Sequence, residues 1–257
     1  MTGWDDLGMT SAVHTKASLR ALWGDAPTGP APRPNAVSAA ERLSAMLTAE
    51  REAHEQGFAL ICGVDEAGRG PLAGPLVAGA ARLLEPESLP EEPGGLNALN
   101  DSKQLSEGQR EALFDALIHG PHVFSACVVT AAEIDRGGIQ QANYGAMSRA
   151  ALALKPAPDY ILVDGYRLPG MRQPCLKMVK GDRRSLSIAA ASIVAKVVRD
   201  HIMVALDAKY PEYGFVNHKG YATPEHLDAI AKHGPCPIHR LSFAPLAKTA
   251  ETGMLFT

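Results

Sequence analysis

The sequence predicts an α/β fold, with one main domain built on a mixed β-sheet. Three observations support this. Three apolar runs of strand length occur early, two more follow later with helical segments between them, and a long Ala-rich segment has the composition of a buried helix. The short connection between the first two runs favours antiparallel neighbours, whereas the later strands are expected to run parallel to the first. A chain of 257 residues is long enough to bury a full hydrophobic core.

The N-terminal fifth has the composition of an extension that leads into this domain. Residues 24–35 are rich in Pro, Gly and Ala, which is typical of a linker. We expect the residues before it to be poorly ordered or to form at most a short helix, so that 1–35 is a disordered extension with its linker. Residues 36–56 predict a lead-in helix that ends at Gly57, and the main domain is expected to span 57–257.

The elements of the main domain follow from apolar runs and helix-capping signals. Strands are predicted at 58–64, 75–84, 122–130, 159–164 and 175–182. Ser106 with Gln109, and Thr130 with Glu133, have the spacing of capping boxes that begin helices. Further helices are predicted at 143–154 and 184–210, and the last begins at Thr223, before Pro224. No internal repeat is present.

Acidic residues occur where three of these strands end. Asp65 and Glu66 end the first, Asp164 ends the fourth and Asp182 closes the fifth. Each acid alone has an ordinary explanation as a turn residue or a helix N-cap. Together, carboxylates at the ends of neighbouring buried strands are expected to converge on one edge of the sheet. Such hard oxygen ligands favour Mg²⁺ or Mn²⁺ over Zn²⁺, and without a cation they would repel one another.

A glycine-rich turn, GRGPLAG at 68–74, follows the first two acids. Its spacing differs from that of a dinucleotide-binding loop, and Pro71 removes an N–H that a phosphate cradle would use. Two interpretations stay open: a tight turn without a ligand, or a loop that lets the backbone approach a nucleic-acid sugar or phosphate closely.

The composition, with 46% hydrophobic and 21% charged residues, is that of an ordinary soluble enzyme. Because the net charge is −3, a nucleic-acid partner would need a local basic patch. Four separated cysteines favour a reduced, cytoplasmic protein, and no apolar run has the length of a membrane span. His233, Cys236 and His239 have the spacing of metal ligands, but the Pro and Gly of their turn and the lack of a fourth ligand disfavour zinc.

Seven stretches in a fixed order give the chain a specific resemblance to the ribonuclease HII family of bacteria. They lie between residue 58 and about residue 247: GVDEAGRGPLAGPLVAGA, NDSKQLSE, ILVDG, VKGD, IAAASIVAKVVRD, YGFVNHKGYATPEHL and HRLSF. The resemblance implies a ribonuclease H-like fold, a mixed five-stranded sheet flanked by helices. It also implies an endonuclease that hydrolyses the RNA strand of RNA/DNA hybrids and cuts 5′ to single ribonucleotides in duplex DNA.

The resemblance assigns roles to individual residues. Asp65, Glu66, Asp164 and Asp182 would be the catalytic carboxylates, binding Mn²⁺ or Mg²⁺ for in-line attack by water that leaves 5′-phosphate and 3′-hydroxyl ends. The backbone of Gly68, Arg69 and Gly70 would read the ribonucleotide 2′-hydroxyl, and Tyr221 would pack on the following deoxyribose. Tyr166 departs from the asparagine of many relatives. The implied setting is ribonucleotide excision repair. Nothing in the sequence demands more than a monomer, so a monomer is expected.

Basic residues that could contact phosphates lie in two settings. Lys103 and Lys219 lie in motif loops and are the preferred substrate-binding candidates, and His218 is a further candidate. Lys196 and Arg199 are expected on the solvated face of the long helix. Other candidates lie near the fifth strand: Lys177, Lys180, Arg183 and Arg184.

Three other functions compete with a nuclease. A binding module without catalysis would gain nothing from four acids beside phosphates, and the loop spacing disfavours a nucleotide-dependent oxidoreductase. A metal-dependent phosphatase or exonuclease would have a similar set of acids. The glycine loop and Tyr221 favour the endonuclease, whereas digestion that depends on a 3′ end would favour this alternative.

Overall fold

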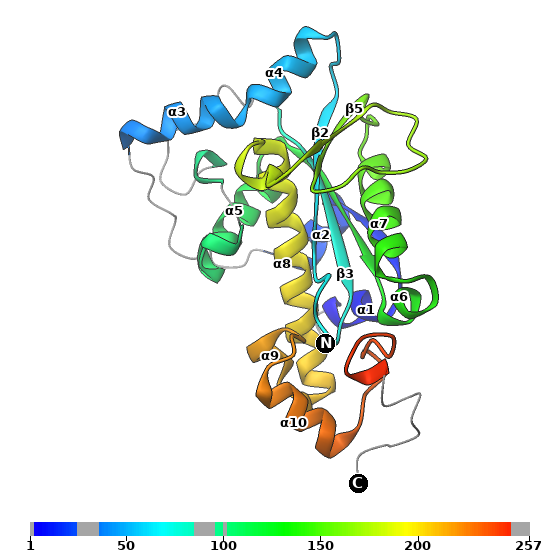
Figure 1. Ribbon diagram of the computed structural model, residues 1–257. Helices are drawn as coiled ribbons and strands as arrows, with labels where there is room; N and C mark the ends of the chain where they lie inside the picture. The colour runs from blue at the N-terminus through cyan, green and yellow to red at the C-terminus, as the bar shows by residue number, and fades with distance from the viewer. Residues whose placement is uncertain (1–2, 25–35, 85–95, 100–101, 248–257) are drawn as a thin grey trace.

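The computed structural model describes residues 3–24, 36–84, 96–99 and 102–247, apart from a few side chains, among them that of Lys103. A mixed six-stranded sheet forms the centre of the molecule, with the strand order β1-β4-β3-β2-β5-β6 (Figure 1). The strands are β1 (Ala12–Thr15), β2 (Ile61–Ala67), β3 (Leu76–Arg82), β4 (Val123–Val129), β5 (Tyr160–Asp164) and β6 (Cys175–Met178).

The predicted strand directions are confirmed. Strand β3 pairs antiparallel with β2 and with β4, whereas β5 runs parallel to β2 and to β6. Both β2 and β5 therefore end at the same edge of the sheet, with Val64 paired to Val163. The acids that follow these two residues, Asp65 and Asp164, are brought to that edge by the register.

The prediction that the residues before the linker are poorly ordered or form at most a short helix was wrong for the described residues 3–24. They form α1 (Trp4–Met9), β1 and α2 (Lys16–Trp23), and β1 pairs antiparallel with β4. The physical reason is apolar burial, because Trp4, Leu19 and Trp23 are all less than 9% exposed. A four-residue strand is too short to show an alternating pattern, so the sequence analysis did not predict β1 and expected five strands instead of six. The predicted linker at 25–35 lies outside the described residues.

Two long helices cover opposite faces of the sheet. Helix α8 (Leu186–Lys209) lies on one face and α7 (Ile139–Ala153) on the other (Figure 1). The alternation along β3 divides its side chains between the two cores: Val77 and Ala81 pack with α8, while Leu76 and Ala78 pack with α7. The predicted solvated face of the long helix is thus wrong for Arg199, which is 1% exposed.

Helix α8 lies unusually close to the sheet because glycines face it. A Cβ atom on Gly63 would lie 2.2 Å from the backbone N of Ile188, and one on Gly79 would lie 2.2 Å from the carbonyl O of Ala191. Asp65 pairs with Gly79 across β2 and β3. The close approach therefore brings α8 beside the carboxylate that ends β2.

The remaining helices mostly begin where capping residues predict. Ser106 and Gln109 form the predicted capping box of α5 (Glu107–His119), and Thr130 accepts from the Glu133 N–H at the start of α6 (Ala131–Gly137). The predicted lead-in helix is divided at Leu47 into α3 (Ala36–Met46) and α4 (Thr48–Glu55). Helices α9 (Phe215–His218) and α10 (Pro224–His233) complete the C-terminal part, and the short helices are η2 (Leu96–Ala98), η3 (Ser102–Gln104), η4 (Gly181–Arg183) and η5 (Pro211–Tyr213).

Candidate active site

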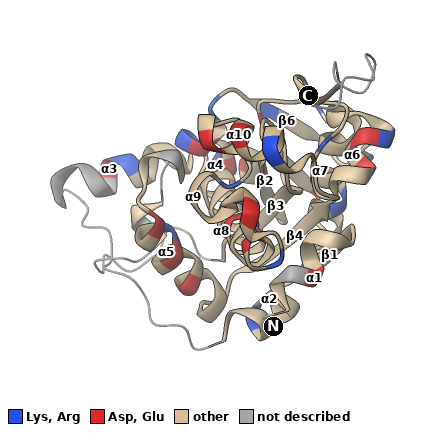
Figure 2. Cartoon of the chain, turned by 90° about the horizontal axis from the view of Figure 1, so that it is seen from below, with Lys and Arg blue, Asp and Glu red and all other residues tan. Residues whose placement is uncertain are grey.

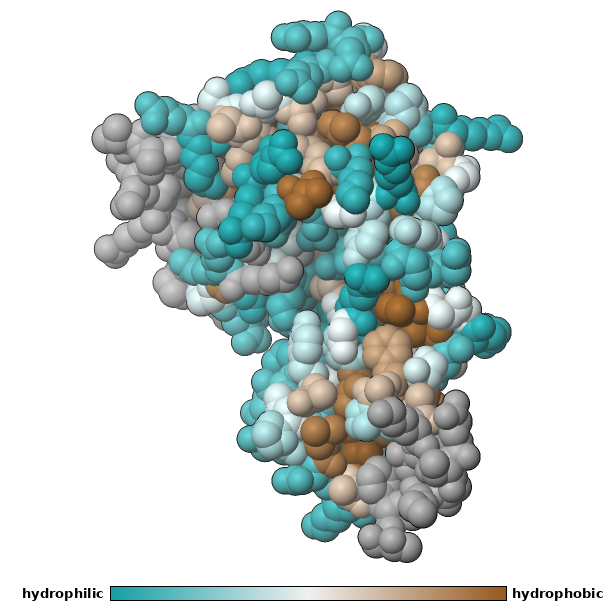
Figure 3. Space-filling model, viewed as in Figure 1, coloured by the Kyte–Doolittle hydropathy of each residue, from teal (hydrophilic) through white to brown (hydrophobic). Residues whose placement is uncertain are grey.

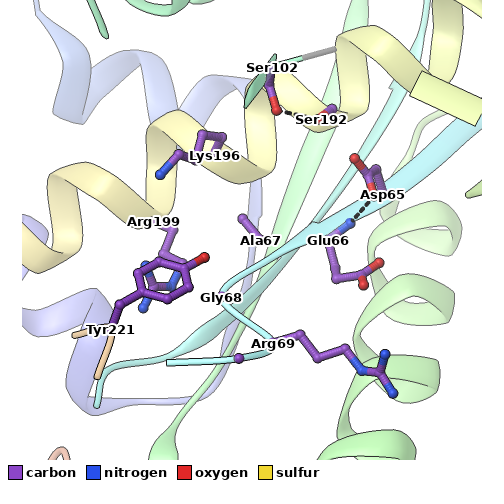
Figure 4. Close-up of a pocket in the computed structure, with 11 residues that line it drawn as sticks. Asp65, Glu66, Ala67, Gly68, Arg69, Ser102, Ser192, Lys196, Arg199 and Tyr221 are labelled. Carbon is purple, nitrogen blue, oxygen red and sulfur yellow. Dashed lines mark hydrogen bonds between the residues drawn. The ribbon is translucent and has the colours of Figure 1, made fainter. Parts of the chain in front are cut away.

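The end of β2 places its two acids on opposite sides of the strand. Asp65 faces α8 beside Ser192, and Glu66 projects the other way (Figure 4). The Glu66 N–H donates to Asp65 Oδ1 at 2.7 Å. Asp65 is only 7% exposed, so its carboxylate is held in a largely buried position.

Asp164, at the end of the neighbouring strand β5, lies next to this pair. Its Oδ1 accepts a hydrogen bond of 2.6 Å from the Gly181 N–H, which fastens η4 to the end of β5. Burial raises the pKa of Asp65 well above its usual value, and the charges of Glu66 and then Asp164 raise it further. These three predicted site residues are therefore close enough to repel one another when all are ionised.

Asp182 reaches the region by a different route from the one predicted. The fifth strand ends at Met178, because Lys180 adopts a left-handed conformation with φ 54°, and Asp182 lies in η4. It is 8% exposed, and Gly181 beside it is the residue that binds Asp164. The predicted strand over 175–182 was too long, but the acid still lies one residue from the Asp164 contact.

The carboxylates have the chemistry of a hard-cation site but do not form a ready-made cage. Among the described residues, no three His, Cys, Asp or Glu side chains are grouped closely enough to hold a metal ion. Oxygen-only donors with mutual repulsion, as the raised pKa of Asp65 indicates, nevertheless fit Mg²⁺ or Mn²⁺. The donor set therefore fits the implied metal.

The glycine loop after β2 is held from below by a buried arginine. Arg240, which is 0% exposed, donates to the carbonyl oxygens of Gly68 at 2.6 Å and of Arg69 at 3.1 Å. In a trans peptide the N–H points opposite to the C=O, so the N–H groups of Arg69 and Gly70 point away from Arg240. The loop can thus offer backbone donors to a ligand.

The Arg69 side chain is fixed by contacts with Tyr166 and Gln140. Its guanidinium donates to the Tyr166 hydroxyl and, at 2.8 Å, to Gln140 Oε1, and it lies 5.2 Å from the centre of the Tyr166 ring. Burial and the neighbouring Glu66 raise the pKa of Tyr166. Tyr166 is therefore the partner of the glycine loop's arginine.

A cavity of about 280 Å³ lies between Asp65, the glycine loop and Tyr221. Tyr221, 47% exposed, forms one wall opposite Asp65 and the glycine loop (Figure 4). The Arg199 guanidinium lies 5.9 Å from the centre of the Tyr221 ring. The residues that line the cavity are Asp65, Glu66, Ala67, Gly68, Arg69, Gly70, Ser102, Ser192, Lys196, Arg199 and Tyr221.

Arg199 supports this pocket from within, which the sequence did not predict. It donates to the carbonyl oxygens of Pro75 at 3.0 Å, of Ala73 at 3.3 Å and of Lys219 at 2.9 Å. These bonds tie the turn after the glycine loop to the loop that carries Tyr221. One signal could have indicated this burial. Arg199 belongs to a motif stretch on an Ala-rich helix, and the face of such a helix that packs on the sheet is buried.

Ser102 and Ser192 are also site residues that sequence reasoning missed. Their hydroxyl oxygens lie 2.8 Å apart, and both line the cavity beside Asp65. Each lies in one of the motif stretches, so the stretches themselves were the only signal for them.

The predicted phosphate-binding residues have different fates. Lys103 lies in η3, but its side chain is outside the described part of the chain. Lys219 donates to the Val216 carbonyl O at 2.6 Å, and Lys196, predicted as solvated, lines the cavity and pairs with Asp200 at 2.8 Å. Basic and acidic residues are interspersed around the molecule (Figure 2). The exposed bases near η4 are Lys177, Lys180, Arg183 and Arg184.

The turn considered for zinc holds no metal-binding group in the described structure. Cys236 and His239 contact each other, but His233 is exposed and belongs to α10. His239 Nδ1 accepts instead from the Cys236 N–H at 2.9 Å. No described helix has the length and hydrophobicity needed to cross a membrane.

Comparison with known proteins identifies the family of the chain. The family model described as ribonuclease HII matches residues 62–246. The ribonuclease HII of Ruminiclostridium cellulolyticum is 50% identical over 205 residues, 79% of this chain and 77% of that protein. The ribonuclease HII of Chlamydia muridarum is 48% identical over 208 residues, which cover 80% of this chain and 91% of that protein.

Solved structures show the same fold. The ribonuclease H2 of Pyrococcus horikoshii OT3 has a TM-score of 0.62 at 30% identity, covering 76% of this chain and 98% of that one. Bst-RNase HIII, solved in complex with Mn²⁺, has a TM-score of 0.57 at 22% identity, covering 83% of this chain and 72% of that one. The ribonuclease H-like fold is therefore confirmed, with six strands here and not five. The chain belongs to the ribonuclease HII family, whose members degrade the RNA of RNA/DNA hybrids.

Proposed function

We propose that this chain is a metal-dependent endonuclease that cuts the RNA strand of RNA/DNA hybrids and cuts 5′ to single ribonucleotides embedded in duplex DNA. The observation that carries the proposal is a single cavity in which Asp65 and Glu66 lie beside the glycine loop, with Tyr221 on the opposite wall. A nuclease that selects ribose needs acids at the scissile phosphate and a contact to the 2′-hydroxyl in the same pocket.

The glycine loop would supply the ribose contact. The N–H groups of Arg69 and Gly70 point away from Arg240, and a Cβ on Gly70 would meet nothing closer than Tyr221 at 4.0 Å. A sugar can therefore approach the backbone of this loop without a side chain in the way. Tyr221 would then pack against the next sugar, since its ring is half exposed toward the cavity.

The four carboxylates would hold the metal: Asp65, Glu66, Asp164 and Asp182. When bound, Mn²⁺ or Mg²⁺ supplies Lewis-acid activation of water and charge stabilisation at the scissile phosphate. The chain's own residues orient this set, because backbone N–H groups donate to the carboxylates of Asp65 and Asp164. Hydrolysis by in-line attack of water would leave 5′-phosphate and 3′-hydroxyl ends.

The test is a DNA duplex with one embedded ribonucleotide, incubated with Mn²⁺, with Mg²⁺ and with excess chelator. The result expected is cleavage 5′ to the ribonucleotide that chelation abolishes, with an all-DNA duplex left intact. Asp65→Asn should lower cleavage roughly 100- to 1,000-fold. Near-normal cleavage by that variant, or cleavage of the all-DNA duplex at the same rate, would contradict the proposal.

Tyr221→Ala separates sugar recognition from catalysis. We expect it to lose cleavage at single ribonucleotides while keeping the wild-type melting temperature, because the side chain is 47% exposed. Unchanged cleavage would remove Tyr221 from the proposed site.

A duplex with both strands closed into circles distinguishes the exonuclease alternative, since an enzyme that needs a 3′ end cannot cut it.

The setting of this activity is also a proposal. We infer a cytoplasmic monomer that binds RNA/DNA hybrid and ribonucleotide-containing DNA and acts in ribonucleotide excision repair. Light scattering of the free chain and of its complex with a non-cleavable duplex would test the monomer, since a dimer would double the mass in both.

A further inference from the structure

Three histidines pack together beneath the Tyr221 wall of the cavity. The rings of His218 and His226 stack with centroids 4.4 Å apart, and His226 Nε2 lies 3.1 Å from His239 Nε2. His226 is 0% exposed and His239 is 2% exposed. None of them lines the cavity, so their contribution must pass through the residues they bind.

The hydrogen-bond partners fix where the protons of this cluster lie. His226 Nδ1 is 2.8 Å from the Tyr221 carbonyl O, which can only accept, so Nδ1 carries the proton and Nε2 is an acceptor. His239 Nδ1 accepts from the Cys236 N–H at 2.9 Å, so His239 must carry its proton on Nε2. His239 Nε2 therefore donates to His226 Nε2, and both rings are neutral with one proton each.

The same segment also holds the glycine loop. Arg240 follows His239 directly and donates to the carbonyl oxygens of Gly68 and Arg69. The backbone of Arg240 is anchored as well, because its N–H donates to the Leu72 carbonyl O at 2.8 Å. Two adjacent residues, His239 and Arg240, thus connect to the two walls of the cavity, one toward Tyr221 and one toward the glycine loop.

We propose that His226 and His239 are positioning residues that hold Tyr221 at a fixed place relative to the glycine loop, and so set the preference for a ribonucleotide that is followed by a deoxyribonucleotide. This inference rests on the proposed function, in which the loop reads the ribose and Tyr221 packs on the next sugar. The geometry requires both rings to stay neutral, because a second proton would set two Nε2–H donors against each other. In agreement, burial lowers the pKa of His226 and lowers that of His239 to about 4.

The test compares two substitutions of His226. The amide N–H of His226→Asn can still donate near the position of Nδ1, whereas His226→Leu has a similar volume and no donor. The measurement is the ratio of kcat/KM on a single embedded ribonucleotide to kcat/KM on a continuous RNA/DNA hybrid. We expect His226→Leu to lower this ratio roughly three- to tenfold, the worth of one hydrogen bond, and His226→Asn to keep most of it.

A double-mutant cycle distinguishes positioning from a general loss of structure. In a Tyr221→Ala background, His226→Leu should not change the ratio further, since the residue it positions is gone. If His226→Leu does not fold, the same comparison is made at His239, the next residue in the hydrogen-bonded cluster. His239→Phe removes the donor to His226, whereas the amide of His239→Gln can still donate. An unchanged ratio in His226→Leu or His239→Phe, or the same drop with and without Tyr221, would overturn the inference. A wild-type chain that does not cut 5′ to single ribonucleotides would instead contradict the proposed function.

Discussion

At the scale of single residues, the site contains ionisable side chains that are buried away from water. Asp65 is buried among other carboxylates, and Arg199 and Arg240 are buried cations that donate only to backbone carbonyls. Each arrangement costs stability compared with an apolar residue. A protein retains such costs where they position a ligand, which is consistent with Asp65 and Arg199 lining one cavity and with Arg240 holding the glycine loop that borders it.

The Asp65→Asn variant turns this cost into a stability prediction. Because the pKa of Asp65 is raised in the folded chain, its ionisation at neutral pH favours the unfolded state. Removing the charge should therefore raise the melting temperature in the presence of chelator, while activity is lost. Thermal unfolding at pH 7 with and without chelator measures this effect, and Asp228→Asn, an exposed position on α10, is the matched control. A lower melting temperature for Asp65→Asn under chelation would contradict it.

At the scale of elements, the position of α8 depends on glycines in the sheet. A Cβ on Gly63 would lie 2.2 Å from backbone atoms of Ser187 and Ile188, which no side-chain rotation can relieve. Gly63→Ala should destabilise the fold by about 1–3 kcal/mol or more and displace α8 from Asp65. Gly145→Ala, inside α7 with open space around it, should instead stabilise by about 0.5–1 kcal/mol. Denaturant unfolding of the two variants would show opposite signs, and equal effects would contradict this account.

The start of α8 is held by a residue from outside the region that matches the family. Glu50 of α4 is 5% exposed, and its Oε1 accepts from the Ser185 hydroxyl at 2.7 Å and from the Ser187 N–H at 3.0 Å. Glu50→Ala leaves both donors buried without this acceptor and should cost about 1–3 kcal/mol. Glu52→Ala, exposed on the same helix, should change the unfolding free energy by less than about 0.5 kcal/mol. A loss for Glu50→Ala no larger than that of Glu52→Ala would show that α4 does not stabilise α8.

These elements also show what the sequence could and could not predict. Long apolar runs and capping residues located five strands and most helices, because those signals are local. The acids of β2 and β5 were predicted to converge because parallel neighbours end at one edge. Strand β1 was not predicted, because it depends on pairing with residues about a hundred positions away. The burial of Arg199 was not predicted either, because periodicity alone does not reveal which face of the helix packs on the sheet.

At the scale of the whole molecule, the cavity is assembled from segments spread over most of the chain. The C-terminal part adds exposed apolar side chains, Val216, Tyr221, Leu227 and Leu241, and apolar residues gather in the lower part of Figure 3. Because Arg199 and Arg240 tie this part to the glycine loop, recognition and folding stability share the same buried bonds. Conditions that disturb the buried polar groups should therefore affect both.

Acid is one such condition, and its effect has a definite sign. The pKa of His239 is about 4 in the folded chain, against an ordinary value of 6.5, so between these values only the unfolded chain binds the proton. The stability that this difference provides is complete above about pH 6.5 and is lost as the pH falls toward 4, by up to about 3 kcal/mol. Denaturant unfolding at several pH values from 7 to 4 measures the slope. His239→Gln should flatten it, whereas His233→Gln, at an exposed position, serves as the control; an equally steep slope in His239→Gln would mean that other groups carry the acid sensitivity.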